Sequence, residues 1–216
     1  MKIASRKLLT RLTLCACLCA VLGAVLGACA PIIVGGAVMG TLMATDRRTS
    51  GTQVEDEGIE LRGASRVRDS LGERGHINVT SYNRQVLLTG EVPAAQDKQL
   101  VEQVLSKVEN VRGIVNELEV MENSTLSQRS SDALITGKVK ASMVDAQDLF
   151  ANAFKVVTER GVTYLMGRVT QREASRATEL VRGIDGVKKV VRVMEIISEE
   201  ELQRLQSKPA PAEVKK

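Results

Sequence analysis

The chain has 216 residues, of which 30 are basic and 26 acidic, and it contains one histidine, four cysteines and no tryptophan. The single histidine, His76, has neither a second histidine nor a free cysteine to form the usual nucleophile–base pairs. No His/Cys cluster suggests a metal site. We therefore predict a protein without enzymatic activity, cofactor or metal.

Residues 1–28 are predicted to be a lipoprotein signal peptide. The segment opens with four basic and no acidic residues, and an apolar run from 12 to 26 follows, as is typical of a secretory signal. Its end, Leu26-Gly27-Ala28-Cys29, resembles the lipobox of bacterial lipoproteins, which implies acylation of Cys29 and cleavage before it. The alanine that follows Cys29 implies sorting to the outer membrane. The alternative is an uncleaved anchor helix, although Pro31 and Gly35-Gly36 interrupt the apolar run.

Residues 29–57 are predicted to form a lipidated, flexible tether, because small residues and turn formers dominate them. Its apolar half is either a plain linker or lies on the membrane beside the acyl chains. The remaining cysteines fall within the signal, so no internal disulfide is expected. Without the four basic residues of the signal, the chain carries 26 charges of each sign, so it is not a polycation.

The next part of the chain holds one pattern twice, at 84–120 and at 161–197. Gly90 and Gly167 are 77 residues apart, and Val111 and Val187, which follow a helical pattern, are 76 apart. Two copies at one period indicate duplicated domains, which we place at 58–122 and 128–198. The first has a net charge of −2 and the second +4, so the second is the more suited to anionic partners.

Each copy is predicted to have the order αββαβ, an α+β fold in which a three-stranded mixed sheet carries two helices on one face. The strands before the repeated pattern are expected at 77–82 and 154–158. In the second copy, Ser131-Asp132 is expected to cap a helix that begins at Ala133. Gly90 and Gly167 are expected to end strands where a Cβ would collide with a neighbour, and Gly186 to end a helix.

The glycine, helix and Gly-Val pattern resembles the BON domain. The residues that carry the resemblance are Gly167-Arg168-Val169 with 186–190, and Gly90-Glu91-Val92 with 111–116. With the lipobox and tether, the chain resembles the dual-BON-domain outer-membrane lipoproteins. This resemblance implies phospholipid binding without catalysis, a periplasmic site at the outer membrane, and a role in envelope integrity and division. The first copy departs from the usual pattern, with Asn110 before Val111 and the glycine displaced to Gly113.

The resemblance also implies that the first helix of the second domain lies on the bilayer and binds anionic phospholipid. An aromatic residue would serve as an interfacial anchor there, but the sequence has Leu134. Alternatively, this helix packs flush against the core and buries its apolar face, which includes Met143. The candidate lipid-binding residues are Leu134, Ile135, Lys138, Val139, Lys140 and Arg129.

Other partners are also conceivable from the sequence. The main alternative function is a periplasmic adaptor that binds envelope-assembly or division proteins. Residues 183–186 have the form of a nucleic-acid GXXG loop, but they contain Asp185 and follow a helix, so a helix-ending turn is the better interpretation and no nucleic acid is expected. Residues 199–216 are predicted to form a short helix from a capping box at Ser198, followed by a disordered tail.

Overall fold

The computed structural model describes residues 46–207, which fall within one compact unit, 41–216. Cys29, the predicted signal, most of the predicted tether and the predicted disordered tail lie outside the described residues. Between residues 46 and 207, no helix combines the length and the apolar character needed to cross a membrane.

The first domain is a mixed sheet with two helices. Strand β2 (Gln85–Val92) pairs antiparallel with β1 (His76–Tyr82) and parallel with both β3 (Gly113–Asn116) and β4 (Glu119–Val120), so the last strand of the predicted unit is divided into two short pieces. Between them, Leu118 is buried and donates its N–H to Asn116. The elements are α3 Ser50–Leu71, β1 His76–Tyr82, β2 Gln85–Val92, α4 Ala95–Leu105, β3 Gly113–Asn116 and β4 Glu119–Val120.

The second domain repeats this arrangement. Strand β6 lies between β5, its antiparallel partner, and β7, its parallel partner. The elements are α5 Leu126–Asp145, a 3-10 turn Ala151–Ala153, β5 Phe154–Glu159, β6 Val162–Thr170, α6 Gln171–Arg182, β7 Lys189–Ile197 and the C-terminal α7 Glu199–Ser207. Both domains therefore have the predicted αββαβ order, and the α+β fold is confirmed.

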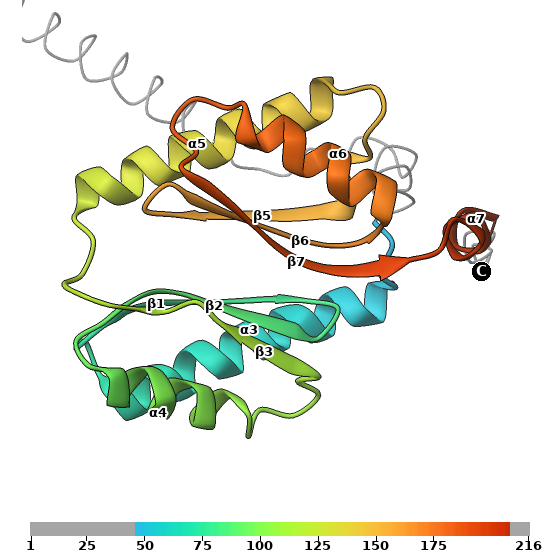
Figure 1. Cartoon of the computed structure of the whole chain (residues 1–216). Coiled ribbons are helices and arrows are strands. Elements are labelled where there is room, and N and C mark those ends of the chain that lie inside the picture. Colours follow the sequence, from blue (N-terminus) through green and yellow to red (C-terminus); the bar gives the residue numbers. More distant parts are fainter. Residues whose placement is uncertain (1–45, 208–216) are drawn as a thin grey trace, which may run out of the picture. The chain divides into compact units, whose positions relative to one another are not determined.

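The two helices of each domain cover the same face of its sheet (Figure 1). In the first domain, Val86 and Leu88 of β2 pack with residues of α3 and α4 in one core. In the second, Leu165 and Val169 of β6 pack with α5 and α6 in another. Burial of these apolar side chains supplies the main driving force for docking the helices.

The opposite faces of the two sheets share a third apolar cluster. Tyr82 and Leu87 of the first domain pack in it with Tyr164 and Met166 of the second. The Tyr82 hydroxyl donates to the carbonyl oxygen of Ala153 at 3.3 Å. The central strands β2 and β6 are therefore buried on both faces, between their helices and the opposite sheet.

Two helices begin earlier than predicted. Helix α3 begins at Ser50, capped by the Thr49 hydroxyl, so Ser50–Glu57 is helical and the prediction of a flexible tether up to residue 57 is wrong there. Helix α5 begins at Leu126, where Thr125 and Gln128 form a capping box, so the predicted cap at Ser131-Asp132 is also wrong.

Instead of capping a helix, Asp132 is buried and holds the hairpin turn between β5 and β6. Its two carboxylate oxygens accept the backbone N–H groups of Arg160 and Gly161, both at 2.8 Å. Asp56 does the same in the first domain, accepting the N–H groups of Asn83 and Arg84 at 2.8 and 2.7 Å. Each first helix thus fixes its hairpin through one buried carboxylate.

The three glycines predicted to be structural lie at other positions in their elements than the sequence suggested. Gly90 and Gly167 lie inside β2 and β6. A Cβ at Gly90 would meet the carbonyl oxygen of His76 on β1, and a Cβ at Gly167 would meet that of Ala153 in the 3-10 turn before β5. Gly186 lies in a turn after α6 has already ended at Arg182, and it has a φ of +97°. In the first copy Asn110, with a φ of +66°, takes this left-handed position, which explains why that copy needs no glycine there.

Candidate functional site

Helix α5 has one face in the core of the second domain. Ile135, Val139 and Met143 are buried there against β5, β6 and α6. Ile135 and Val139 were predicted to bind lipid, and that part of the prediction is wrong, because their side chains already fill the core. The alternative of a helix packed against the core is therefore correct for this face.

The opposite face of α5 presents apolar and small residues to solvent. Leu134 stands at its centre and is 70% exposed. Residues at helical spacing around it are small, namely Ser130, Gly137 and Ala141, and a Cβ added at Gly137 would meet no atom within 4 Å. Leu126 and Val144, one near each end of the helix, are 78% and 70% exposed. These exposed apolar residues share one face of a helix whose other face is already buried, which makes this face a candidate interaction surface.

Basic side chains flank this face. Lys138 follows Leu134 by one turn and lies beside it, and its Nζ is 3.2 Å from an Asp185 carboxylate oxygen in an exposed ion pair. Lys140 is exposed on the other side. Arg129 donates from Nε and Nη2 to the carbonyl oxygen of Ser124 at the start of the helix. We define the Leu134 strip as Leu126, Ser130, Leu134, Gly137, Ala141 and Val144, with Lys138 and Lys140 as its basic flank.

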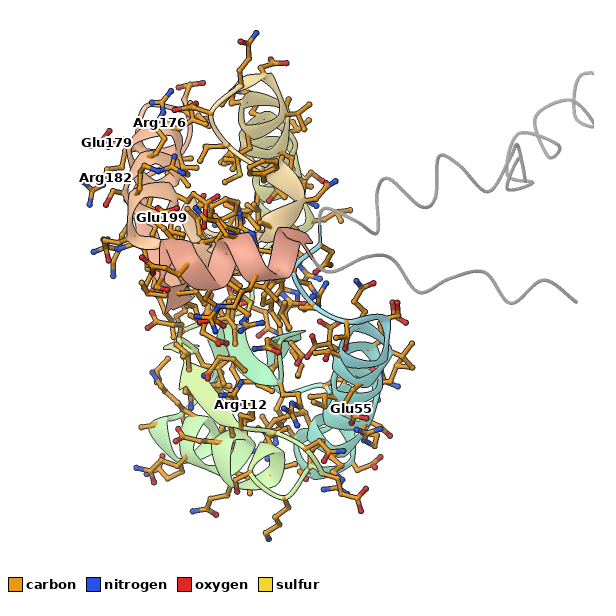
Figure 2. All side chains as sticks on the ribbon, turned by 90° about the vertical axis from the view of Figure 1, so that its right-hand side faces the viewer. Glu55, Arg112, Arg176, Glu179, Arg182 and Glu199 are labelled. Carbon is orange, nitrogen blue, oxygen red and sulfur yellow. The ribbon has the colours of Figure 1, made fainter. Side chains whose placement is uncertain are left out.

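The neighbouring helix, α6, exposes charged side chains to solvent, in contrast to α5. Its labelled side chains Arg176, Glu179 and Arg182 extend outward in Figure 2, and Arg176 pairs with Asp148 of the loop after α5. No leucine or valine of α6 is exposed to the extent of Leu134. The two helices pack on one sheet, so the apolar character of the Leu134 strip is a property of α5 alone.

Several contacts fix the orientation of α5. Asp132 anchors it to the β5–β6 hairpin, and Ile135 packs so close to Gly186 that a Cβ there would lie 2.8 Å from it. These contacts determine which residues face outward. Leu126 and Val144 were not predicted, because the helix was expected to begin at Ala133. The capping residues Thr125 and Gln128 are the sequence signal that would have extended it to include Leu126.

The first domain has exposed leucine and valine as well, but in a different setting. Leu61 and Val54 of α3 are exposed, and the charged side chains Glu57, Arg62 and Arg68 are exposed on the same helix. Val54 and Leu61 are seven residues apart and share one face of α3, so exposed apolar side chains alone do not distinguish the two first helices. The net charge of this domain, −2, disfavours an anionic partner.

Comparison with known families decides the identity of the two domains. The BON domain model matches residues 61–122 and 131–198, one match for each copy of the repeat. The chain belongs to the BON-domain family. The matches begin within α3 and α5, so the family pattern covers both first helices only in part.

Several known proteins are similar to this chain over half of its length or more. The chain is 35% identical over 171 residues to Outer membrane lipoprotein DolP of Haemophilus influenzae, which covers 78% of this chain and 89% of the relative. It is 34% identical over 154 residues to the 21 kDa hemolysin of Actinobacillus pleuropneumoniae, covering 70% and 79%. Osmotically-inducible protein Y of Escherichia coli is 27% identical over 117 residues, covering 53% and 58%. The resemblance to dual-BON-domain outer-membrane lipoproteins is confirmed.

Proposed function

We propose that this protein is a non-catalytic outer-membrane lipoprotein whose second BON domain binds anionic phospholipid through the Leu134 strip of α5. One observation carries the proposal: Leu134 is exposed at the centre of an apolar strip that has lysines on its flanks, on a helix whose other face is buried. This arrangement suits a membrane surface, where apolar side chains enter the acyl region and basic ones meet phosphates.

Both parts of the surface contribute to binding. Each basic residue near an anionic membrane contributes about 1 kcal/mol, and this contribution is screened by salt. Full burial of one leucine side chain contributes about 1.5–3 kcal/mol and depends little on salt. Lys138 keeps its ammonium group exposed although it pairs with Asp185, so exchanging that partner for a lipid phosphate costs little.

The anchor and the helix would act together. Acylation of Cys29, which the lipobox favours, would hold the chain at the periplasmic side of the outer membrane, and the name of the Haemophilus relative supports that location. A tethered domain binds the same surface at a high effective concentration, so modest affinity of α5 suffices. Such binding would let the protein contribute to the integrity of the outer membrane.

Charge reversal on α5 is the test of this function. We expect the double variant Lys138→Glu/Lys140→Glu of unlipidated residues 41–216 to lose most of its binding to anionic vesicles. Loss of two contributions of about 1 kcal/mol corresponds to about 30-fold in affinity, and reversal adds repulsion. Co-sedimentation at two salt concentrations measures the loss, and circular dichroism checks that the variant is folded.

A matched control separates the site from the overall charge. Arg172→Glu/Arg182→Glu makes the same change of net charge on α6 of the same domain and should reduce binding far less. Leu134→Asp should weaken binding even at high salt. Parent-like binding by the folded α5 double variant would exclude α5 as the lipid site, and no binding by the parent would favour the adaptor that recruits envelope or division proteins.

A further inference from the structure

A cluster of titratable side chains lies where the two BON domains meet, away from the Leu134 strip. His76 opens β1 and is the cross-strand partner of Glu91 in β2, so the sheet holds the two side by side. Glu159, the last residue of β5, comes from the other domain. One nitrogen of His76 and one oxygen of each carboxylate lie within 4.8 Å of one another.

The two carboxylates turn one oxygen each towards the same nitrogen of His76. The Nδ1 atom is 3.1 Å from Oε2 of Glu91 and 3.8 Å from Oε1 of Glu159. Four tetrahedral ligands at the usual 2.0–2.2 Å from zinc lie about 3.3–3.6 Å from one another. The observed distances bracket that spacing, so small side-chain adjustments would place all three atoms on one ion.

Neighbouring residues hold the outer oxygens of both carboxylates. Arg160 donates from Nε to Oε1 of Glu91 at 2.5 Å, and Asn78 donates to Oε2 of Glu159 at 2.9 Å. Each carboxylate is thus fixed by a partner on one oxygen and presents the other to His76, where Oε2 of Glu91 also accepts the N–H of Ser124 at 3.1 Å. Metal ligands are commonly oriented in this way by hydrogen-bonding partners behind them.

The cluster is buried on one side and partly exposed on the other. The His76 side chain is 20% exposed, whereas the Glu91 side chain is completely buried. The Ser124 hydroxyl, in the segment between the domains, lies 3.3 Å from Nδ1. The cluster thus borders solvent on the His76 side.

We propose that His76, Glu91 and Glu159 bind one Zn²⁺ ion, which bridges the first and second BON domains. One imidazole nitrogen with two carboxylate oxygens is a ligand set that suits zinc, whereas Mg²⁺ prefers oxygen ligands in an octahedral arrangement. Because Arg160 neutralises part of the negative charge of Glu91, the site is suited to reversible binding. The ion would couple zinc availability to the rigidity of the interface.

The sequence itself simplifies the test, because His76 is the single histidine. Zinc titrated into the purified, nitrogen-15-labelled protein should shift the two imidazole resonances of one residue and fix the tautomer with the proton on Nε2. Calorimetry should give one zinc per chain, and equal concentrations of Mg²⁺ should produce neither effect. Unmoved imidazole resonances at a tenfold excess of zinc, or an equal response to Mg²⁺, would overturn the proposal.

Two variants of the ligands and one control complete the design. His76→Gln and Glu159→Gln should each weaken zinc binding at least tenfold. Glu195→Gln is the control. The Glu195 carboxylate also joins the two domains, by accepting from Asn83, but it lies outside the cluster. The Glu195→Gln protein should therefore bind zinc like the parent. Parent-like zinc binding by a folded Glu159→Gln variant would contradict a site shared between the domains.

Discussion

Replacing Gly90 with alanine is expected to lower the free energy of unfolding by roughly 3 kcal/mol or more. A Cβ at this position would lie 1.9 Å from the carbonyl oxygen of His76 on the adjacent strand, and the backbone has a φ of +112°. The unusual dihedral costs about 1–3 kcal/mol for a non-glycine residue, and forced overpacking adds about 1–3 kcal/mol. Urea denaturation followed by circular dichroism measures the change.

Two other glycines serve as comparisons for Gly90. Gly137 is exposed within α5 and a Cβ there meets nothing, so Gly137→Ala should stabilise the protein by up to about 1 kcal/mol. Gly167→Val should cost roughly 2 kcal/mol, since a Cβ would lie 2.6 Å from the Ala153 carbonyl oxygen but the backbone is unstrained. If the free energy of unfolding of Gly90→Ala were within about 1 kcal/mol of the parent value, β1 and β2 would be able to move apart at little cost, and the predicted clash would be wrong.

Removing the carboxylate of Asp56 should have a similarly large effect. Asp56 is buried and accepts the N–H groups of Asn83 and Arg84 and the Ser81 hydroxyl. It also pairs with Arg48 at 2.8 Å. Asp56→Ala leaves these donors without an acceptor in a dry environment, so we expect a loss of about 3–5 kcal/mol.

Asp56→Asn is the matched variant, because its amide retains one oxygen and nearly the same volume. It should recover part of the stability by accepting one turn N–H, while the alanine variant recovers none. In the second domain, Asp132→Ala should be less costly, since Asp132 accepts two N–H groups, whereas Asp56 accepts two N–H groups and a hydroxyl and also pairs with Arg48. Equal stability of the Asp56 alanine and asparagine variants would contradict a hydrogen-bonding role.

The repeat allowed the fold to be predicted, because local signals were consistent in both copies. Alternating apolar residues gave β1 and β5 to within one residue, and Gly90 and Gly167 marked the same strand position twice. The starts of α3 and α5 were missed, since the threonine caps Thr49 and Thr125 precede polar turns with weak apolar periodicity. Capping depends on one side chain and leaves little trace in a hydrophobic pattern.

The candidate site was predicted only in part. The helix and its lysines were found, but the sequence did not reveal which apolar residues face outward. That depends on the contacts of Asp132 and Ile135 with turns far along the chain. The cluster of His76 with Glu159 could not be predicted, because it joins residues of different domains whose packing leaves no pattern in either repeat.

An ion pair between Arg47 and Glu173 shows why the last part of the predicted tether is ordered. Arg47 donates to both carboxylate oxygens of Glu173 at 2.7 and 2.6 Å, which attaches the start of the described chain to the second domain. Burial alone would raise the pKa of Glu173, but Arg47 and the Thr170 N–H outweigh it and hold that pKa below its usual value. The polar composition of the segment around Arg47 suggested a flexible chain. Its ion pair with Glu173, a buried residue 126 positions further on, holds the segment in place instead.

A tryptophan probe on α5 would show whether the Leu134 strip enters a membrane. The chain has no tryptophan, so the emission of a Leu134→Trp variant reports on that position alone. The Leu61→Trp variant is the control, because Leu61 is 75% exposed on α3 of the first domain. Adding anionic vesicles should shift the emission of Leu134→Trp to the blue as its indole leaves water, and should leave Leu61→Trp unchanged. An unchanged spectrum of Leu134→Trp, under conditions in which the protein sediments with those vesicles, would contradict lipid binding through this helix.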